Sequence, residues 1–174
     1  MKNEEVLSQL SKEDLIKLIE MYSKNLVALD GLWFQSIERK FGMNEAIYHD
    51  EEAWKRCTVI EAKRIKEFLH LEEHPGILGL KKALQLRFNT NINEDSFVLD
   101  KNTLVYTVNE CRVQAARKRK NMPYHPCKSV GMFEYANFAK TIDDRFTCCC
   151  LSCYPDMTDD QCSCKWEFIL NEDM

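Results

Sequence analysis

The segment that decides the fold class runs from Phe97 to Val108 and has the sequence Phe-Val-Leu-Asp-Lys-Asn-Thr-Leu-Val-Tyr-Thr-Val. Its two ends are rich in β-branched and aromatic residues, which favour β-strands. Its centre, Asp100-Lys101-Asn102, consists of residues that favour a turn. The segment therefore predicts a β-hairpin. Because the residues before it follow a helical pattern, we expect an α+β fold.

The N-terminal half of the chain, residues 1–90, contains three predicted helices. The first begins at a cap at Ser11 and ends at Gly42. It carries a stripe of apolar residues at helical spacing, which is typical of an amphipathic helix. The stripe consists of Leu15, Leu18, Ile19, Tyr22, Leu26, Leu29, Trp33, Ile37 and Phe41. A second helix is expected from near Asp50 to Leu69, and a third begins after the break at Pro75.

The C-terminal half, residues 96–170, mixes strands and helices. Besides the hairpin, the patterns predict helices at residues 113–120 and 129–142 and strands at residues 145–149 and 164–170. The last two strands are joined by a cysteine-bearing loop. No linker separates the two halves, so we expect a single domain over residues 1–174. In this domain the helical half packs on a small antiparallel sheet with a cysteine-rich C-terminal loop.

Composition and charge exclude some classes of protein. The chain has 174 residues, and 24 basic against 28 acidic residues give a net charge of −4, which is unlike a generally basic nucleic-acid-binding protein. No apolar run is long enough to span a membrane. Residues 1–10 include Lys2, Glu4 and Glu5 without an apolar stretch, which predicts no secretory signal and a cytoplasmic location. In a reducing compartment, cysteines serve as metal ligands or redox groups more often than as structural disulfides.

The nine cysteines carry the clearest chemical signal, because six of them lie between Cys148 and Cys164. Zn²⁺ takes four soft ligands in a tetrahedron, often a C-x-x-C pair and a second pair supplied by the fold. The candidate ligands are Cys127, Cys150, Cys153 and Cys164, with Cys162 as the alternative to Cys164 and His125 as a further candidate. An iron–sulfur cluster or a redox dithiol would use the same cysteines, and buried thiols without a ligand are the remaining interpretation.

A second candidate site follows the hairpin, in the segment Glu110-Cys111-Arg112-Val113-Gln114-Ala115-Ala116-Arg117. A helix that begins directly after a strand presents backbone N–H groups to an anion. The same setting would acidify Cys111, which is therefore the candidate nucleophile. We expect a pocket for a small carboxylate or phosphate, lined by Cys111, Arg112, Gln114, Arg117, Trp33, Phe34 and Trp54. In the alternative interpretation Arg117 is structural and pairs with Glu38 or Glu61, and the segment is a solvated basic helix beside a buried cysteine.

Five motifs are spread over the second half of the chain: Glu110-Cys111-Arg112-Val113-Gln114-x-x-Arg117, Cys127-Lys128-x-Val130-Gly131, Phe138-Ala139-x-x-Ile142-Asp143, Cys150-x-x-Cys153-x-Pro155-Asp156 and Cys164-x-Trp166-x-Phe168. Together with Asp30-Gly31-Leu32-Trp33-Phe34 and Trp54, they resemble an uncharacterised family of small prokaryotic cytosolic proteins, a domain of unknown function. The order of strands, helices and cysteines is also similar to the aminothiazoline-carboxylate hydrolase family and to the 4-vinyl-reductase-type ligand-binding domain.

The last resemblance implies a mixed α/β fold and a zinc site formed by cysteines and an acid. In that comparison Cys127, Cys153 and Cys164 match the ligand cysteines, and Cys150 matches the position of the acidic ligand.

Two function classes follow from the sequence. The first is a small-molecule-binding or sensor-like protein for an anionic ligand, with a structural zinc site. The second is a hydrolase-like enzyme that acts on a small carboxylate with Cys111 and Arg112 at the pocket; an iron–sulfur or redox protein is a further alternative. No Ser-His-Asp arrangement or Gly-rich phosphate loop is present. We also expect a homodimer, because the antiparallel sheet of the second half, which ends in the strand from Trp166 to Leu170, leaves one edge to cover. In the alternative interpretation a helix of the N-terminal half covers that edge.

Overall fold

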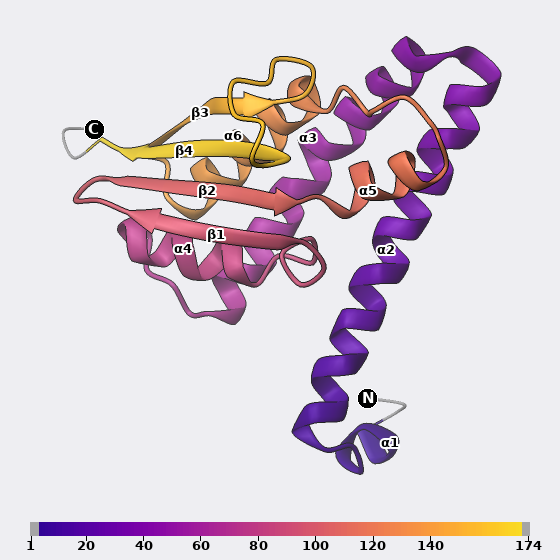
Figure 1. Cartoon of the computed structure of the whole chain (residues 1–174). Coiled ribbons are helices and arrows are strands. Elements are labelled where there is room, and N and C mark those ends of the chain that lie inside the picture. Colours follow the sequence, from indigo (N-terminus) through magenta and orange to yellow (C-terminus); the bar gives the residue numbers. More distant parts are fainter. Residues whose placement is uncertain (1–3, 172–174) are drawn as a thin grey trace.

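Helices make up most of the first half of the chain, and a sheet forms in the second half (Figure 1). This computed structural model describes residues 4–171, and the expectations that involve residues 1–3, among them Lys2, and residues 172–174 lie outside it. The elements are α1 (Glu4–Ser8), α2 (Lys12–Phe41), α3 (Met43–Phe68), α4 (Gly76–Gln85), β1 (Glu94–Leu99), β2 (Thr103–Glu110), α5 (Arg112–Arg119), α6 (Lys128–Ile142), β3 (Phe146–Cys153) and β4 (Cys164–Leu170). The predicted α+β fold is confirmed.

The sheet has four antiparallel strands in the order β1-β2-β4-β3. The predicted hairpin forms β1 and β2, with Phe97 opposite Tyr106. Strand β4 lies inside the sheet, because Glu167 is opposite Val105 of β2 on one side and Cys149 of β3 on the other. The edge strands are β1 and β3. The sheet thus has two edges, neither of them β4, and the homodimer remains a prediction.

The first two long helices are joined by a single turn at Gly42. At the other end of α2, the Ser11 hydroxyl accepts a hydrogen bond from the backbone N–H of Asp14 at 3.1 Å, as the predicted cap requires. Gly42 has a φ of 91°, which a residue without a side chain adopts easily, and the chain reverses there. Helix α3 consequently begins at Met43, earlier than the start near Asp50 that the sequence suggested.

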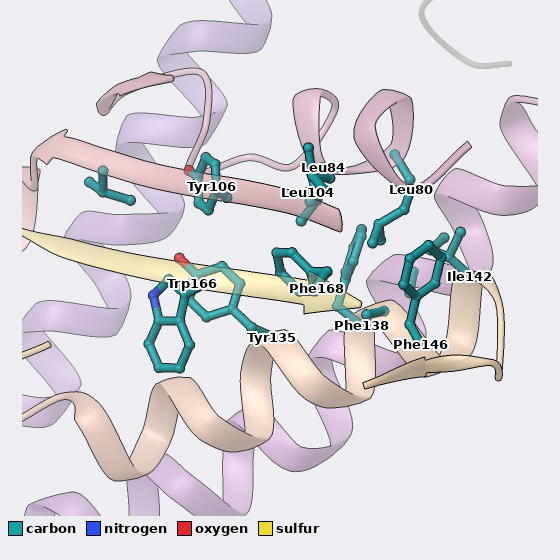
Figure 2. Packing of buried hydrophobic residues seen from close by; sticks show 14 of the residues in the cluster. Leu80, Leu84, Leu104, Tyr106, Tyr135, Phe138, Ile142, Phe146, Trp166 and Phe168 are labelled. Atoms are coloured by element: carbon teal, nitrogen blue, oxygen red, sulfur yellow. The ribbon is translucent and has the colours of Figure 1, made fainter. Parts of the chain in front are cut away.

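The core lies between one face of the sheet and the helices α3, α4 and α6 (Figure 2). Aromatic residues dominate its centre, where Tyr135 of α6 packs against Tyr106 of β2 and Trp166 of β4, with ring centroids 5.8 and 4.6 Å apart. Trp166 and Phe168 alternate with solvent-side residues along β4, so the strand buries one face.

Helix α2 contacts the rest of the protein through one side only. Ser23 and Phe34 are buried on that side, and α2 packs along α3. Most of the apolar stripe that marked this helix in the sequence lies on another side and is exposed; for example, Leu29 is 64% and Trp33 69% exposed. In Figure 1 the N-terminal end of α2, with α1 beside it, extends beyond the sheet. Despite the length of α2, no helix in residues 4–171 is both long and apolar enough to cross a membrane.

Candidate functional site

A cavity of about 120 Å³ lies where α2, α3 and α6 meet the ends of β2, β3 and β4. Its wall includes the start of α5 and the loop that follows α4. The polar and sulfur-bearing lining residues are Asp30, Asp50, Trp54, Asn89, Asn93, Cys111, Arg112, Gln114, His125, Cys127, Glu134, Tyr135, Cys153, Cys164 and Trp166. The cavity thus brings one end of the sheet together with both long N-terminal helices.

Three of the four predicted metal ligands meet at this cavity. Cys127 is the residue before α6, Cys153 ends β3 and Cys164 begins β4. Cys153 and Cys164 are directly opposite each other in the sheet. The Sγ atoms of Cys127 and Cys153 are 3.6 Å apart, and the neighbouring thiol of Cys164 raises the pKa of Cys153. The sequence predicted this set of cysteines, and the fold brings these three thiols together from three separate elements.

A bulge in β3 lets the fourth predicted ligand, Cys150, point to the same side of the sheet. Residues three apart in a regular strand face opposite sides, so a C-x-x-C pair in a strand is normally split. Here the register shifts between Cys150 and Ser152, and the extra residue restores the alternation. Cys150 is opposite Trp166, whose side chain is in the core. The alternative ligand Cys162 instead contacts the carbonyl of Asp159 in the loop.

The thiols of Cys127 and Cys153 have opposite protonation tendencies. Hydrogen bonds from Cys153 and Gln114 lower the pKa of Cys127, whereas donating to the sulfur atoms of Cys127 and Cys164 raises the pKa of Cys153. The two thiols therefore titrate as a pair that shares one proton between the sulfur atoms more readily than two. A thiolate at the start of a helix is the form in which cysteine binds a soft metal or acts as a nucleophile.

The geometry around the thiols leaves room for adjustment. The ligand atoms of Cys127, Cys153 and Cys164 do not all lie within 4.8 Å of one another, so binding one ion requires side-chain rotation. Within residues 4–171, the ligand atoms of His74, Asp143 and Asp144 do all lie within 4.8 Å of one another. At this second place Arg145 already pairs with both oxygens of Asp143, at 2.9 and 2.8 Å, and the N–H of Gly76 donates to it. The Asp143 carboxylate is therefore neutralised within the chain.

Two buried carboxyl groups, Asp30 of α2 and Asp50 of α3, form another part of the cavity wall. Burial raises the pKa of Asp30 to about 6 and that of Asp50 to about 8, and repulsion between acidic neighbours adds to both shifts. No lysine or arginine in the described part of the chain forms an ion pair with either residue; Asp50 is 3.5 Å from His125 Nε2. Burial lowers the pKa of His125 to about 4, so this ring is neutral at pH 7.

The third acid of the wall, Glu134, is compensated within the protein. Arg87, which is only 1% exposed, lies 2.8 Å from Glu134 and 2.9 Å from Glu61, and Asn89 donates to Glu134 at 3.1 Å. Asp30 and Asp50 lack such a cation, which distinguishes them as groups that a ligand could complete.

The side chain of Trp166 is a further polar contributor to the cavity. It is 1% exposed, and its indole Nε1–H has no hydrogen-bond partner among residues 4–171. Figure 2 shows the indole between β4 and α6. Buried N–H groups are rarely left unpaired, so this donor is available to an acceptor atom in the cavity.

The basic segment after the hairpin differs from its predicted role. Burial raises the pKa of Cys111 to about 12, so the expected acidification does not occur. Arg112 is exposed at the cavity rim, and Gln114 lines the cavity but holds the backbone of His125 through two hydrogen bonds of 2.7 and 3.0 Å. Arg117 does not line the cavity; it is 3% exposed and pairs with both oxygens of Glu38, at 2.9 and 2.7 Å. The structure thus gives Arg117 the structural role that the alternative interpretation named.

The two N-terminal tryptophans differ in their position relative to the cavity. Trp54 lines the cavity, stacked on Phe88 at 5.8 Å, whereas Trp33 is 69% exposed and does not contribute. Phe34 is buried against His125 at 4.4 Å, behind the lining residues. Trp33 was expected in the wall because it shares a helix with wall residues, but its side chain lies on the exposed side of α2.

The sequence analysis missed both buried aspartates. A signal for Asp30 was present, because it is the only charged residue between Lys24 and Glu38. Asp50 follows His49 in the sequence and resembled a helix cap. In the structure α3 begins seven residues earlier, at Met43, so Asp50 lies inside the helix, where it is buried.

The comparisons with known proteins give a family but no activity. A family model described as a family of unknown function, DUF6125, matches residues 8–170. No curated protein and no solved structure is significantly similar to the chain. The matched range contains the cavity, the cysteines and all four strands, and the chain belongs to this family of unknown function.

Proposed function

We propose that the protein binds a small molecule in the cavity beside a zinc ion held by Cys127, Cys153 and Cys164. The observation that carries the proposal is the convergence of these three thiols, from the start of α6, the end of β3 and the start of β4, on one cavity. Their donor set suits Zn²⁺, which is bound by thiolates in closed structural sites and in sites that keep one position for a ligand. The lowered pKa of Cys127 supports metal binding at neutral pH.

Cys150 is the proposed fourth zinc ligand. It shares the core side of the sheet with Cys153 because of the bulge in β3, and Cys164 is opposite Cys153 on that side. The resemblance to 4-vinyl-reductase-type domains supports the same group of positions, with an acid in place of this cysteine. A cytoplasmic location, which remains a prediction, would keep all these thiols reduced.

The wall of the cavity favours a small ligand with a protonated amine and a hydrogen-bond acceptor. Asp30 and Asp50 offer a carboxylate site for the amine, and the Trp166 N–H offers a donor for the acceptor. Of the two arginines expected to bind an anionic ligand, Arg117 pairs with Glu38 outside the cavity and Arg112 is exposed at its rim. Since an apolar cavity of roughly 150 Å³ holds benzene, a volume of about 120 Å³ fits a ligand of comparable or smaller size.

A redox dithiol is the second candidate function, and one contact favours it. The 3.6 Å separation between the Sγ atoms of Cys127 and Cys153, with the unequal pKa values of the two thiols, is the arrangement that disulfide formation requires. The hydrolase-like alternative with Cys111 as nucleophile is disfavoured, because burial keeps the pKa of this thiol at about 12.

Metal analysis of anaerobically purified protein tests the zinc site. We expect about one zinc per chain, and titration of metal-free protein with Co²⁺ should produce the absorption of cobalt–thiolate bonds. Cys127→Ser and Cys153→Ser should each weaken Zn²⁺ binding at least tenfold, and Cys150→Ser decides whether Cys150 is the fourth ligand. The matched control is Cys149→Ser, which changes an exposed cysteine of the same strand and should bind Zn²⁺ like the wild type. Metal-free protein that forms a Cys127–Cys153 disulfide and ignores Zn²⁺ would support the redox function instead.

Binding of small amines tests the ligand class. Calorimetry on the zinc-loaded protein with propylamine and propanoate, a pair of similar size and opposite charge, should show binding of the amine alone. The Asp30→Asn variant should lose this binding while keeping its zinc, because Asp30 is on α2, away from the cysteines in sequence. Preferential binding of propanoate would contradict the proposed ligand class but not the metal site.

A further inference from the structure

Helix α2 carries six exposed apolar residues with the spacing of a coiled-coil seam. They are Leu15, Ile19, Tyr22, Leu26, Leu29 and Trp33, which we call the α2 seam. Successive members are separated by four, three, four, three and four residues, so every one occupies an a or d position of a heptad. Their exposed fractions range from 36% at Leu15 to 69% at Trp33.

The fold leaves this seam uncovered although α2 already has a packed side. The packed side includes Ser23 and Phe34, which are buried, and Val27 and Asp30, which line the cavity. The seam is therefore a second apolar side of the same helix, and its N-terminal end is on the part of α2 that extends beyond the sheet (Figure 1). A helix with two apolar sides is typical of one that packs against its own domain and against a partner.

We propose that two copies of this chain form a dimer through antiparallel pairing of their α2 seams. In an antiparallel pair, each a residue packs against a d residue of the other helix. A two-fold axis beside residue 24 places Trp33 against the partner subunit's Leu15. It also places Leu29 against the partner subunit's Ile19, and Leu26 against the partner subunit's Tyr22. All six seam positions are filled in this register, and every contact is apolar.

The residues flanking the seam fit the same register. Leu18 comes to lie beside the partner subunit's Leu32, which extends the apolar contact on both ends of the axis. Asn25 meets the partner subunit's Asn25 at the axis, where a pair of amides can hydrogen-bond and fix the register. Leu32 is 61% exposed and adds to the area that the pairing would bury.

The size of the surface supports a second copy as the occupant. A stable dimer interface buries on the order of 800 Å² per partner, and exposed apolar patches of several hundred square ångströms mark interaction sites. The six seam residues with Leu18 and Leu32 present an apolar strip of this order, four helical turns or more in length. An apolar groove lined by Ile16, Ile19, Phe68 and Leu86 adjoins the strip.

Antiparallel pairing also suits the shape of the molecule. The sheet, α5 and α6 lie toward the C-terminal half of α2 in Figure 1, so reversing one helix places the two sheets toward opposite ends of the pair. Parallel pairing would instead bring both sheets to the same end. It would also stack the two Trp33 side chains, and the two Tyr22 side chains, directly against each other.

Light scattering on the eluate of a size-exclusion column tests the dimer. At about 10 μM the wild-type chain should have twice the 20.5 kDa mass of one chain. Leu26→Glu and Leu29→Glu, each of which puts a charge in the seam, should elute as folded monomers with unchanged far-ultraviolet circular dichroism. The matched control is Leu78→Glu on α4, where leucine is 64% exposed but outside the seam, and this variant should remain a dimer. A wild-type monomer at about 100 μM, or seam variants that stay dimeric, would overturn the proposal.

Cross-linking tests the orientation. Asn25→Cys should form a disulfide-linked dimer on mild oxidation, because the two copies of residue 25 meet only in the antiparallel register. The neighbouring variant Lys24→Cys, which is on the outer side of the pair, and the wild type give the background from the native thiols. Cross-linking of Asn25→Cys no stronger than this background would exclude the antiparallel register.

Discussion

The Asp50 carboxyl group reduces the stability of the folded protein at neutral pH. An aspartate in an unfolded chain has a pKa near 3.9, whereas burial raises the pKa of Asp50 to about 8 in the fold. The folded state therefore binds the proton more tightly than the unfolded state. The contribution of Asp50 to stability is complete below about pH 4 and is lost as the pH rises towards 8. Asp30, whose pKa is raised to about 6, acts in the same direction.

Replacing Asp50 by asparagine should stabilise the metal-free and ligand-free protein. Asparagine cannot ionise, so the free energy of unfolding at pH 8 should rise by about 1 kcal/mol or more, and its decline between pH 5 and pH 8 should become shallower. Urea unfolding at several pH values measures both effects. Asp160→Asn, an exposed change in the loop before β4, should leave the pH profile as in the wild type. A destabilised Asp50→Asn protein at pH 8 would show that the carboxylate is needed for folding.

Among individual residues, those whose chemistry is evident from their spacing could be predicted from the sequence. Cys153 of the C-x-x-C pair, Cys164 after it and Cys127 before the second predicted helix of this half are the three predicted ligands that the fold brings together. Asp50 could not be predicted, because its burial depends on α6 and the loop after α4 packing over it. The same limit applied to Arg117, whose partner Glu38 is 79 residues away in the chain.

Close packing between α6 and β4 depends on the glycine at position 131. A Cβ atom built on Gly131 would lie 2.5 Å from Cζ2 and 2.7 Å from Cη2 of Trp166, which is shorter than any normal contact. Glycine in a helix is otherwise unfavourable by roughly 0.5–1 kcal/mol relative to alanine. The close approach of the indole therefore explains why a glycine occupies this helical position.

Gly131→Ala should destabilise the protein although alanine favours helices. Overpacking against Trp166 costs about 1–3 kcal/mol, which exceeds the gain in helix propensity. Chemical denaturation measures the loss, and Trp166 fluorescence should change with it. The matched control is Gly31→Ala in α2, where the added Cβ meets only Gln35 Nε2 at 4.0 Å. This variant should gain up to about 1 kcal/mol, and equal effects of the two changes would contradict the packing argument.

Element boundaries were predictable where a local signal fixes them and not where the tertiary structure does. Ser11 and Gly42 delimit α2 as expected, and the hairpin of β1 and β2 is present with its turn at residues 100–102. The apolar stripe of α2 predicted a helix but not which of its sides would be buried, because periodicity does not tell which apolar side packs on the core. The bulge in β3 also has no clear sequence signal, since it is defined by pairing with β4.

Across the whole molecule, Arg87 ties together parts that are distant in sequence. Its guanidinium group is enclosed between Glu61 of α3 and Glu134 of α6, and it lies over the ring of Phe138 at 4.7 Å. Removing one member of such a buried network leaves unpaired charge behind and is more costly than the net value of the network. The network fixes α3 and α6 relative to the loop that follows α4, and these are three walls of the cavity.

Helix α2 carries part of the cavity wall on one side and the proposed dimer surface on another, and this has a thermodynamic consequence. Val27 and Asp30 line the cavity. The residue before each of them, Leu26 and Leu29 respectively, belongs to the exposed α2 seam. A molecule that shifts or stiffens the helix from within therefore also changes the surface available for association. If a ligand in the cavity changes the dissociation constant of the dimer by some factor, dimerisation must change the dissociation constant of the ligand by the same factor. Ligand concentration and protein concentration would then be interchangeable controls on the same equilibrium.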